Sequence, residues 1–191
     1  IVTAIRRVAP DCFIIVDGIQ HAAHGGIDLS ATDVDGYAIS PYKVFSRHGY
    51  GIGWISERLT AVAHDCLLNG PADNWELGTR DTAAYATFSA VVRYFEWLGG
   101  QITDETAPRT RIEAAGRAIQ AQEAGLVNAM LYGLDNLPGL AERPELTLLG
   151  GADNPRREGL VCFISEKIDP VELVSRLRDR GIRVHVRRND H

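Results

Sequence analysis

The sequence predicts an α/β fold in which part of a mixed, mostly parallel sheet precedes a small α+β domain. The apolar run at residues 12–16 ends directly in Asp17, as buried parallel strands do in α/β proteins. Beyond Pro138 the pattern changes to short strands around a single helix. We therefore predict two domains, residues 1–104 and residues 105–191, each an incomplete part of its fold.

The first domain is predicted to combine strands and helices. Apolar residues recur at helical spacing up to Val8, and Pro10 ends that pattern. Ser56 followed by Glu57 is typical of the start of another helix. The predicted helices cover residues 1–8, 56–64 and 82–98, and the predicted strands cover residues 12–16, 36–39 and 51–55.

The second domain is predicted to follow the longest helix, which starts at residue 107 or 111 and reaches residue 134. Gly181 marks the end of a later helix. The elements expected beyond Pro138 are strands at residues 146–149, 160–165 and 182–186 and a helix at residues 170–180.

Composition excludes two classes of partner. The 191 residues carry a formal net charge of −5, and the 20 lysines and arginines are spread along the chain, which argues against a nucleic-acid-binding surface. The longest apolar run has the length of a buried strand and falls far below the roughly 20 residues of a membrane-spanning helix. We expect neither nucleic acid nor a membrane as a partner.

The cysteines indicate a reducing compartment. Cys12, Cys66 and Cys162 lie far apart, form no CxxC pair and are odd in number, which does not fit a disulfide framework. We therefore predict a cytoplasmic protein. The chain starts at Ile1 without an initiator methionine or a targeting segment, so we also expect a fragment of a longer protein.

Lys43 is the first candidate for a catalytic residue. It and Lys167 are the two lysines of the sequence, and it lies in SPYKVFSRHGYGIG, between a strand end and a glycine-rich turn. A lysine amine in a partly desolvated cleft acts as a nucleophile and proton carrier, for example as a Schiff-base lysine. The alternative is an ordinary solvated loop lysine.

Three polar residues near Lys43 fit a pyridoxal phosphate site. The Asp17 carboxylate can pair with the protonated pyridine nitrogen and keep the ring an electron sink. Gln20 can donate its amide to the phenolic oxygen of the cofactor, and Ser40 can hold the phosphate. Asp17 can equally be a turn or N-cap residue, Gln20 a surface glutamine and Ser40 a turn serine.

Other site patterns are weaker. His21 and His24 form an HxxH pair, but no further ligand stands at a zinc-site spacing, so we predict no metal site. The glycine-rich turn does not match the GxGxxG dinucleotide motif. A cluster of arginines can bind a substrate carboxylate by bidentate pairing or can be solvated surface; its members are Arg183, Arg187 and Arg188.

Residues 16–56 resemble the cofactor-lysine region of the class V aminotransferase family, in the sequence VDGIQHAAHGGIDLSATDVDGYAISPYKVFSRHGYGIGWIS. This family of pyridoxal-phosphate enzymes includes cysteine desulfurases and selenocysteine lyases. Further on, WELGTRDTAAYATFSAVVRYFEWLG is similar to the family's segment around Gly-Thr and the helix after it. The resemblance implies the large domain of a three-layer, pyridoxal-phosphate-dependent transferase fold.

The resemblance also implies roles for single residues. Lys43 would be the Schiff-base lysine, and Asp17, Gln20 and Ser40 would hold the ring and the phosphate. Thr79 would reach the phosphate of a neighbouring subunit's cofactor, which implies a homodimer. Tyr42 replaces the histidine that desulfurases have before the lysine, and its hydroxyl remains within reach of a phosphate.

The expected function is that of a pyridoxal-phosphate-dependent enzyme acting on an amino acid, as an aminotransferase or a carbon–sulfur lyase. A cysteine desulfurase is the alternative that the sequence favours less. The family's nucleophile is a cysteine after the segment that matches residues 182–186, and this sequence has none there, whereas persulfide chemistry needs a thiolate close to the substrate. The alternative from another class is a non-catalytic remnant or scaffold domain of the same fold. The sequence does not identify the substrate.

Overall fold

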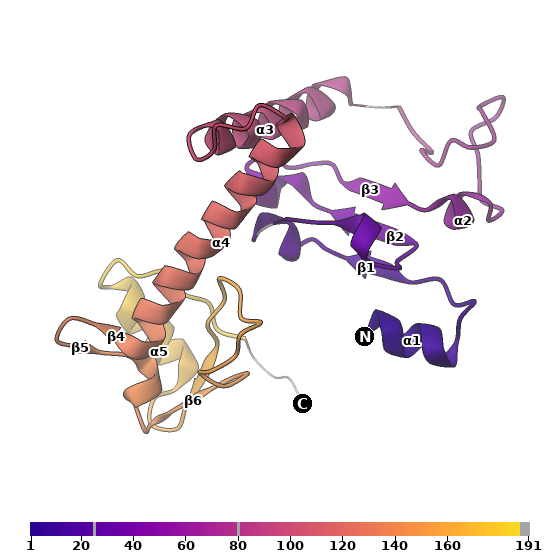
Figure 1. Cartoon of the computed structure of the whole chain (residues 1–191). Helices are drawn as coiled ribbons and strands as arrows, with labels where there is room; N and C mark the ends of the chain where they lie inside the picture. Colours follow the sequence, from indigo (N-terminus) through magenta and orange to yellow (C-terminus); the bar gives the residue numbers. More distant parts are fainter. Residues whose placement is uncertain (25, 80, 188–191) are drawn as a thin grey trace. The chain divides into compact units, whose positions relative to one another are not determined.

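The chain folds as two units, residues 1–119 and residues 120–191, in the computed structural model shown in Figure 1. The structure describes residues 1–24, 26–79 and 81–187, so Arg188 of the predicted arginine cluster lies outside the described residues. The division of the chain into domains at residues 104 and 105 stays a prediction.

A three-stranded mixed sheet forms the centre of the first unit. Its strands are β1 (Ile15–Asp17), β2 (Gly36–Ile39) and β3 (Ile52–Ile55), in that order. β1 runs parallel to β2, and β2 runs antiparallel to β3. The predicted α/β class with a mixed sheet is therefore confirmed, although one strand pair is parallel and one is antiparallel where a mostly parallel sheet was predicted.

β1 begins three residues later than the sequence predicts. The backbone N–H of Ile14 donates to the side-chain oxygen Oδ2 of Asp35 at 2.9 Å, so it does not enter the sheet ladder. Strand pairing starts at Ile15, which lies opposite Gly36. Cys12 consequently precedes the strand and is exposed, whereas the apolar run predicted it to be inside the strand.

The helices of the first unit start at residues whose side chains cap them. They are α1 (Val2–Val8), α2 (Glu57–Thr60) and α3 (Thr82–Gly100), and α4 (Pro108–Tyr132) continues into the second unit. Ser56 accepts the Leu59 N–H at the start of α2, and Asp81 accepts the Ala84 N–H at the start of α3. α2 ends earlier than the predicted residue 64, since the backbone turns after Ala61.

A small core lies between α3 and the sheet. Val91 of α3 packs with Ala22 and Val44, and Ile39 of β2 and Phe95 pack against them. Ala22 and Val44 belong to short 3₁₀ helices, η1 (His21–Ala23) and η3 (Pro41–Val44), and these two helices contact each other. A third, η2 (Leu29–Ala31), connects η1 to β2. The core thus holds both turns that carry predicted site residues.

After α4, the second unit consists of short strands, one 3₁₀ helix and one α-helix, which agrees with the predicted α+β class. Its elements are β4 (Gly133–Leu134), β5 (Leu137–Pro138), η4 (Leu140–Glu142), β6 (Leu146–Leu148), β7 (Phe163–Ser165) and α5 (Pro170–Arg178). β4 pairs with β5 and β6 pairs with β7, both antiparallel.

The prediction of a strand at residues 182–186 is wrong. This segment follows α5 without regular secondary structure, although Val184 and Val186 are half-buried and His185 between them is exposed. The alternation that predicted a strand is present, but a strand also needs a neighbour to which its backbone groups can bond. No hydrogen bond of the described residues pairs this segment with β6 or β7.

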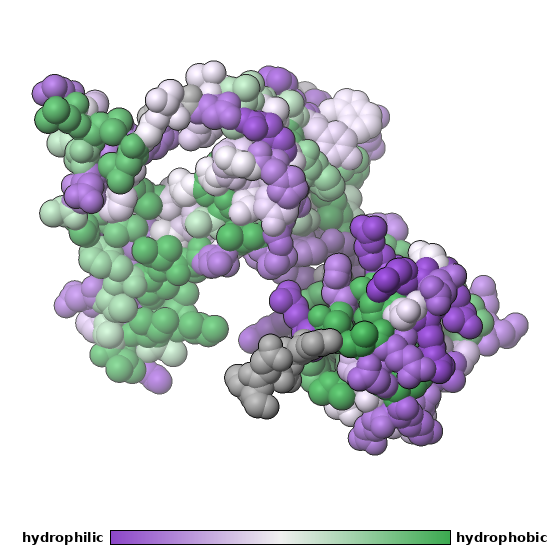
Figure 2. Space-filling model, turned by 180° about the vertical axis from the view of Figure 1, so that it is seen from behind, coloured by the Kyte–Doolittle hydropathy of each residue, from purple (hydrophilic) through white to green (hydrophobic). Residues whose placement is uncertain are grey.

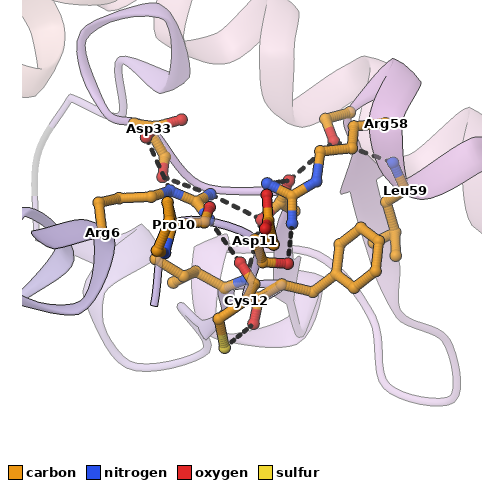
Figure 3. Close-up of polar contacts among 11 residues, drawn as sticks. Arg6, Pro10, Asp11, Cys12, Asp33, Arg58 and Leu59 are labelled. Atoms are coloured by element: carbon orange, nitrogen blue, oxygen red, sulfur yellow. Dashed lines mark hydrogen bonds and ion pairs between the residues drawn. The ribbon is translucent and has the colours of Figure 1, made fainter. Parts of the chain in front are cut away.

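A buried ion network lies at the end of the sheet opposite the carboxyl ends of β1 and β2. Asp35 precedes β2 and is 3% exposed, and its carboxylate contacts Arg6 of α1 at 2.8 Å and Arg58 of α2 at 3.6 Å. The two arginines approach from opposite sides in Figure 3. The network therefore joins both helices to the sheet.

Large apolar side chains also reach the surface of both units, as the green areas of Figure 2 show. Ile15 and Trp97 in the first unit and Leu137 in the second are all more than half exposed. None of the helices in the described part of the chain is long and apolar enough to cross a membrane.

Candidate functional site

Asp17 stands at the carboxyl end of β1 and is held there by a backbone group. Its side-chain oxygen Oδ1 accepts the Ile19 N–H at 3.1 Å, and the residue is exposed. Asp17 lies opposite Ala38 in β2, and Ala38 lies opposite Gly53 in β3. Because opposite residues share a face of a sheet, the carboxylate borders a row of small residues.

This row leaves space beside Asp17. Ala38 is exposed, and a Cβ placed on Gly53 would meet nothing within 4 Å. The other face of the sheet carries Ile39, which packs in the core under α3. A flat ligand therefore finds room against the sheet on the face that Asp17 borders.

Ser40 and Lys43 are brought together by the turn that follows β2. The Lys43 N–H donates to the Ser40 carbonyl at 3.0 Å, which starts the 3₁₀ helix η3. Side chains alternate along an extended chain, so Ser40 lies on the same face as Ala38. The hydroxyl of Ser40 and the amine-bearing turn thus stand at the same sheet edge as Asp17.

The amine of Lys43 lies beside an aromatic ring. Its Nζ atom is 5.6 Å from the ring centroid of Tyr42, within the range of a cation–π contact. Lys43 is half-buried and Tyr42 is 40% exposed. Tyr42 also stacks on His48, with ring centroids 4.1 Å apart. The lysine is therefore not an isolated solvated side chain.

The loop after Lys43 is tied to α3 by polar contacts. Ser46 Oγ lies 2.6 Å from the Tyr50 hydroxyl and 3.0 Å from the Thr87 hydroxyl of α3. Arg47 forms an ion pair with Asp81, the N-cap residue of α3. Hydrogen bonding from the backbone of α3, followed by the Arg47 guanidinium, holds the pKa of Asp81 below its usual value.

Gln20 is close to this turn, but Thr79 is not connected to it. Gln20 is the N-cap residue of η1, which contacts η3, and its side chain is exposed. Thr79 is exposed in the loop before α3. No hydrogen bond among the described residues links Thr79 to Asp17, Ser40 or Lys43. The fold thus gathers five predicted site residues near one sheet edge and leaves Thr79 apart; the five are Asp17, Gln20, Ser40, Tyr42 and Lys43.

His21 of the HxxH pair contacts a tyrosine of the sheet. His21 Nδ1 lies 2.8 Å from the Tyr37 hydroxyl of β2. Within the described residues, no three histidine, cysteine or carboxylate side chains converge as metal ligands. The three cysteines are free; Cys12 and Cys66 are exposed, and Cys162 is half-buried just before β7.

No sequence motif pointed to His48 or to Asp35 as a functional residue. Tyr42 and His48 are six residues apart, a spacing that matches no helical period, and the chain reverses between them at Phe45, whose φ of 65° has no signal in the sequence. Asp35 stands directly before a predicted strand, a position that for a carboxylate usually means exposure. Its burial depends on Arg6, 29 residues away.

The amino-acid sequence matches one family model and several known proteins. The family model described as aminotransferase class-V matches residues 1–187. A probable cysteine desulfurase of Xylella fastidiosa is 31% identical over 185 residues, covering 89% of this chain and 39% of that protein. The nonribosomal peptide synthetase-like enzyme fsqF of Aspergillus fumigatus is 34% identical over 107 residues, covering 50% of this chain and 7% of that protein.

A solved structure has the same fold. The cysteine desulfurase CsdA of Escherichia coli superimposes with a TM-score of 0.61 at 22% identity, and the match covers 95% of this chain and 42% of that one. The chain therefore spans about two fifths of the length of the desulfurase relatives it matches.

Proposed function

Because the chain belongs to the class V aminotransferase family, we propose that it is part of a pyridoxal-phosphate-dependent enzyme that acts on an amino acid, as an aminotransferase or a carbon–sulfur lyase. The predicted family and fold class are confirmed by the family match and by the superposition on CsdA. The observation that carries the proposal is the Ser40–Lys43 turn, which lies at the same sheet edge as Asp17.

The residues at this edge fit pyridoxal phosphate. The cofactor has a cationic ring nitrogen, a phosphate and an aldehyde, and the site offers a carboxylate, a hydroxyl and an amine in Asp17, Ser40 and Lys43. The small residues beside Asp17 leave the sheet face open to a flat ring. When bound, the cofactor supplies an electron sink for a carbanion at the substrate Cα.

Each side chain has a proposed task in the reaction. Lys43 would hold the cofactor through its amine and would take and return the proton at the substrate Cα. Asp17 keeps the pyridine nitrogen protonated. Gln20 would donate a hydrogen bond to the phenolic oxygen, and the hydroxyls of Ser40 and Tyr42 would donate hydrogen bonds to the phosphate oxygens.

We further propose how the enzyme assembles and where in the cell it works. Thr79 reaches the phosphate site of a second copy of the chain, so the active enzyme is a homodimer. The exposure of Thr79, away from the Lys43 turn, leaves it available for such a contact. The three free cysteines support a reducing, cytoplasmic location.

Reductive trapping tests the proposal directly. The protein is incubated with pyridoxal phosphate and reduced with borohydride, and the labelled peptides are identified by mass spectrometry. Label confined to Lys43 is expected, with Lys167 as the internal control, and Lys43→Ala abolishes both label and turnover. Equal label on the two lysines, or none, would contradict the proposal and favour the non-catalytic scaffold.

A cysteine desulfurase is the second candidate, supported by the names of several relatives. The described cysteines argue against it, because none lies in the segment after α5, where the family's nucleophile is expected. Formation of alanine and persulfide from cysteine would favour desulfuration. Pyruvate and ammonia would favour elimination, and a requirement for a keto acid would favour transamination.

A further inference from the structure

His48 returns to the Lys43 turn through a tightly reversed backbone. Phe45, between Tyr42 and His48, has φ 65°, in the left-handed region. The Ser46 N–H donates to the Pro41 carbonyl at 3.1 Å and closes the turn between them. The reversal brings the His48 ring against Tyr42, with centroids 4.1 Å apart and planes inclined by 18°.

The same tyrosine ring carries the Lys43 contact. Nζ of Lys43 lies 5.6 Å from the Tyr42 centroid, where the ring quadrupole attracts the ammonium. Tyr42 is 40% exposed, so the surrounding protein does not enclose its ring. Stacking on His48 is the ring contact that restrains it.

We propose that His48 is a positioning residue for Lys43: its ring fixes Tyr42, and Tyr42 in turn holds the lysine side chain where its amine meets the cofactor. This inference rests on the proposed function, because it assigns His48 a task in cofactor attachment. His48 acts through Tyr42 and has no contact of its own with the reacting atoms.

The physical reason is conformational freedom. A lysine side chain has four rotatable bonds and loses considerable entropy when its amine is held in one place. An ordered aromatic ring offsets part of that loss before the reaction begins, which raises the effective concentration of the amine at the cofactor. A mobile tyrosine ring gives no such advantage.

The loop geometry makes the stack a stable feature. Ser46 and Tyr50, on either side of His48, are hydrogen-bonded to each other and to Thr87 of α3. Arg47, directly before His48, pairs with Asp81. The backbone at residue 48 is thus fixed from both sides, and the histidine ring is presented to Tyr42 by an anchored loop.

Three variants separate stacking from other effects. His48→Ala removes the ring, and His48→Phe keeps a flat ring that can stack but has no ring nitrogen. His64→Ala is the matched control, because His64 stacks on Trp75 with a similar centroid distance of 4.2 Å elsewhere in the same unit.

The first readout requires no cofactor. Both lysines of the full chain are reductively methylated with ¹³C-formaldehyde, and their methyl signals are recorded by NMR. The ring current of Tyr42 is expected to displace the Lys43 signal from that of Lys167, which has no ring contact in the described residues. His48→Ala should move the Lys43 signal toward that of Lys167, whereas His48→Phe and His64→Ala should leave it in place.

The second readout is the ratio of borohydride-trapped pyridoxal phosphate on Lys43 to that on Lys167 at one fixed pH. We expect His48→Ala to lower this ratio about threefold, in line with the usual strength of an aromatic stack, and His48→Phe to restore it. An unchanged ratio or an unchanged methyl signal in His48→Ala would overturn the inference. A wild-type chain without preferential label on Lys43 would instead overturn the proposed function, while the methyl signals still report on the stack.

Discussion

Asp35 and Arg6 form a buried ion pair, with the carboxylate accepting a hydrogen bond from Arg6 Nη2 at 2.8 Å. The Arg6 side chain is 15% exposed, and that of Asp35 is 5% exposed. Arg6 also donates through Nε to Asp33 at 2.7 Å, but the Asp33 side chain is 74% exposed. One guanidinium therefore contacts a buried and an exposed carboxylate.

This difference predicts unequal losses of stability. Asp35→Asn removes the buried charge and leaves the largely buried Arg6 guanidinium with the exposed Asp33 carboxylate as its ion-pair partner, so it should lower the free energy of unfolding by about 3 kcal/mol. Asp33→Asn, the matched control, should cost below about 1 kcal/mol because water screens that pair. Urea denaturation followed by circular dichroism measures both. Equal losses would refute the assignment of the stability to the buried pair.

The same carboxylate predicts a dependence on pH. Burial would raise the pKa of Asp35, but the Arg6 hydrogen bond, the Ile14 N–H and the charge of Arg58 together hold it below its usual value. A carboxyl whose folded pKa is lowered stabilises the protein fully above its unfolded pKa of about 4 and loses that effect as the pH falls through the folded pKa. The wild type should therefore lose stability below about pH 4 more steeply than Asp35→Asn.

Asp17 should matter for turnover and not for folding. Asp17→Asn keeps the oxygen that accepts the Ile19 N–H but removes the charge proposed for the pyridine nitrogen. We expect turnover to fall about a hundredfold with little change in melting temperature. Asp28→Asn is the matched control, since Asp28 is exposed and accepts the Ser30 N–H two residues on in the same way. A comparable loss of turnover in both variants would contradict the role of Asp17.

Gly18, directly after Asp17, is predicted to tolerate no side chain. A Cβ at this position would lie 2.1 Å from the Tyr37 ring, which is held by its contact with His21. Gly18→Ala should therefore displace Tyr37 and cost about 1–3 kcal/mol. Gly53→Ala should cost less, because its Cβ meets nothing within 4 Å. Thermal denaturation compares the two, and a near-neutral Gly18→Ala would show that Tyr37 yields easily.

The sequence predicted the elements whose signals are local. β2 begins and ends at the predicted residues 36 and 39, and α3 begins at the predicted Thr82 because Asp81 caps it. Ser40 and Lys43 were predicted as neighbours of one site, and the 3₁₀ turn that joins them spans three residues, a local distance. These features depend on neighbours a few residues away.

The features that the sequence did not predict depend on distant partners. β1 starts late because Asp35, 21 residues on, takes the Ile14 N–H. Residues 182–186 alternate like a strand but have no paired neighbour among the described residues. The stacking of His48 on Tyr42 needs a left-handed residue between them, and that residue is Phe45, a residue type that rarely adopts that conformation.

Complementation between variants at Thr79 and Lys43 tests the proposed homodimer. If Thr79 of one subunit completes the site that contains Lys43 of the other, each active site needs both residues from different chains. Lys43→Ala and Thr79→Val should each lower turnover when assayed separately. In a mixed dimer, one site then carries both substitutions and the other carries neither.

Mixing the two variants should therefore restore activity. With equal amounts and free exchange of subunits, half of the dimers are mixed and each has one intact site, so turnover should recover to about a quarter of the wild-type value. A mixture of Lys43→Ala with Ser40→Ala is the control, because both residues lie in one turn of the same chain and no mixed site contains both intact. Recovery in neither mixture would place Thr79 outside a shared site, since a residue acting within its own subunit cannot be supplied by another copy.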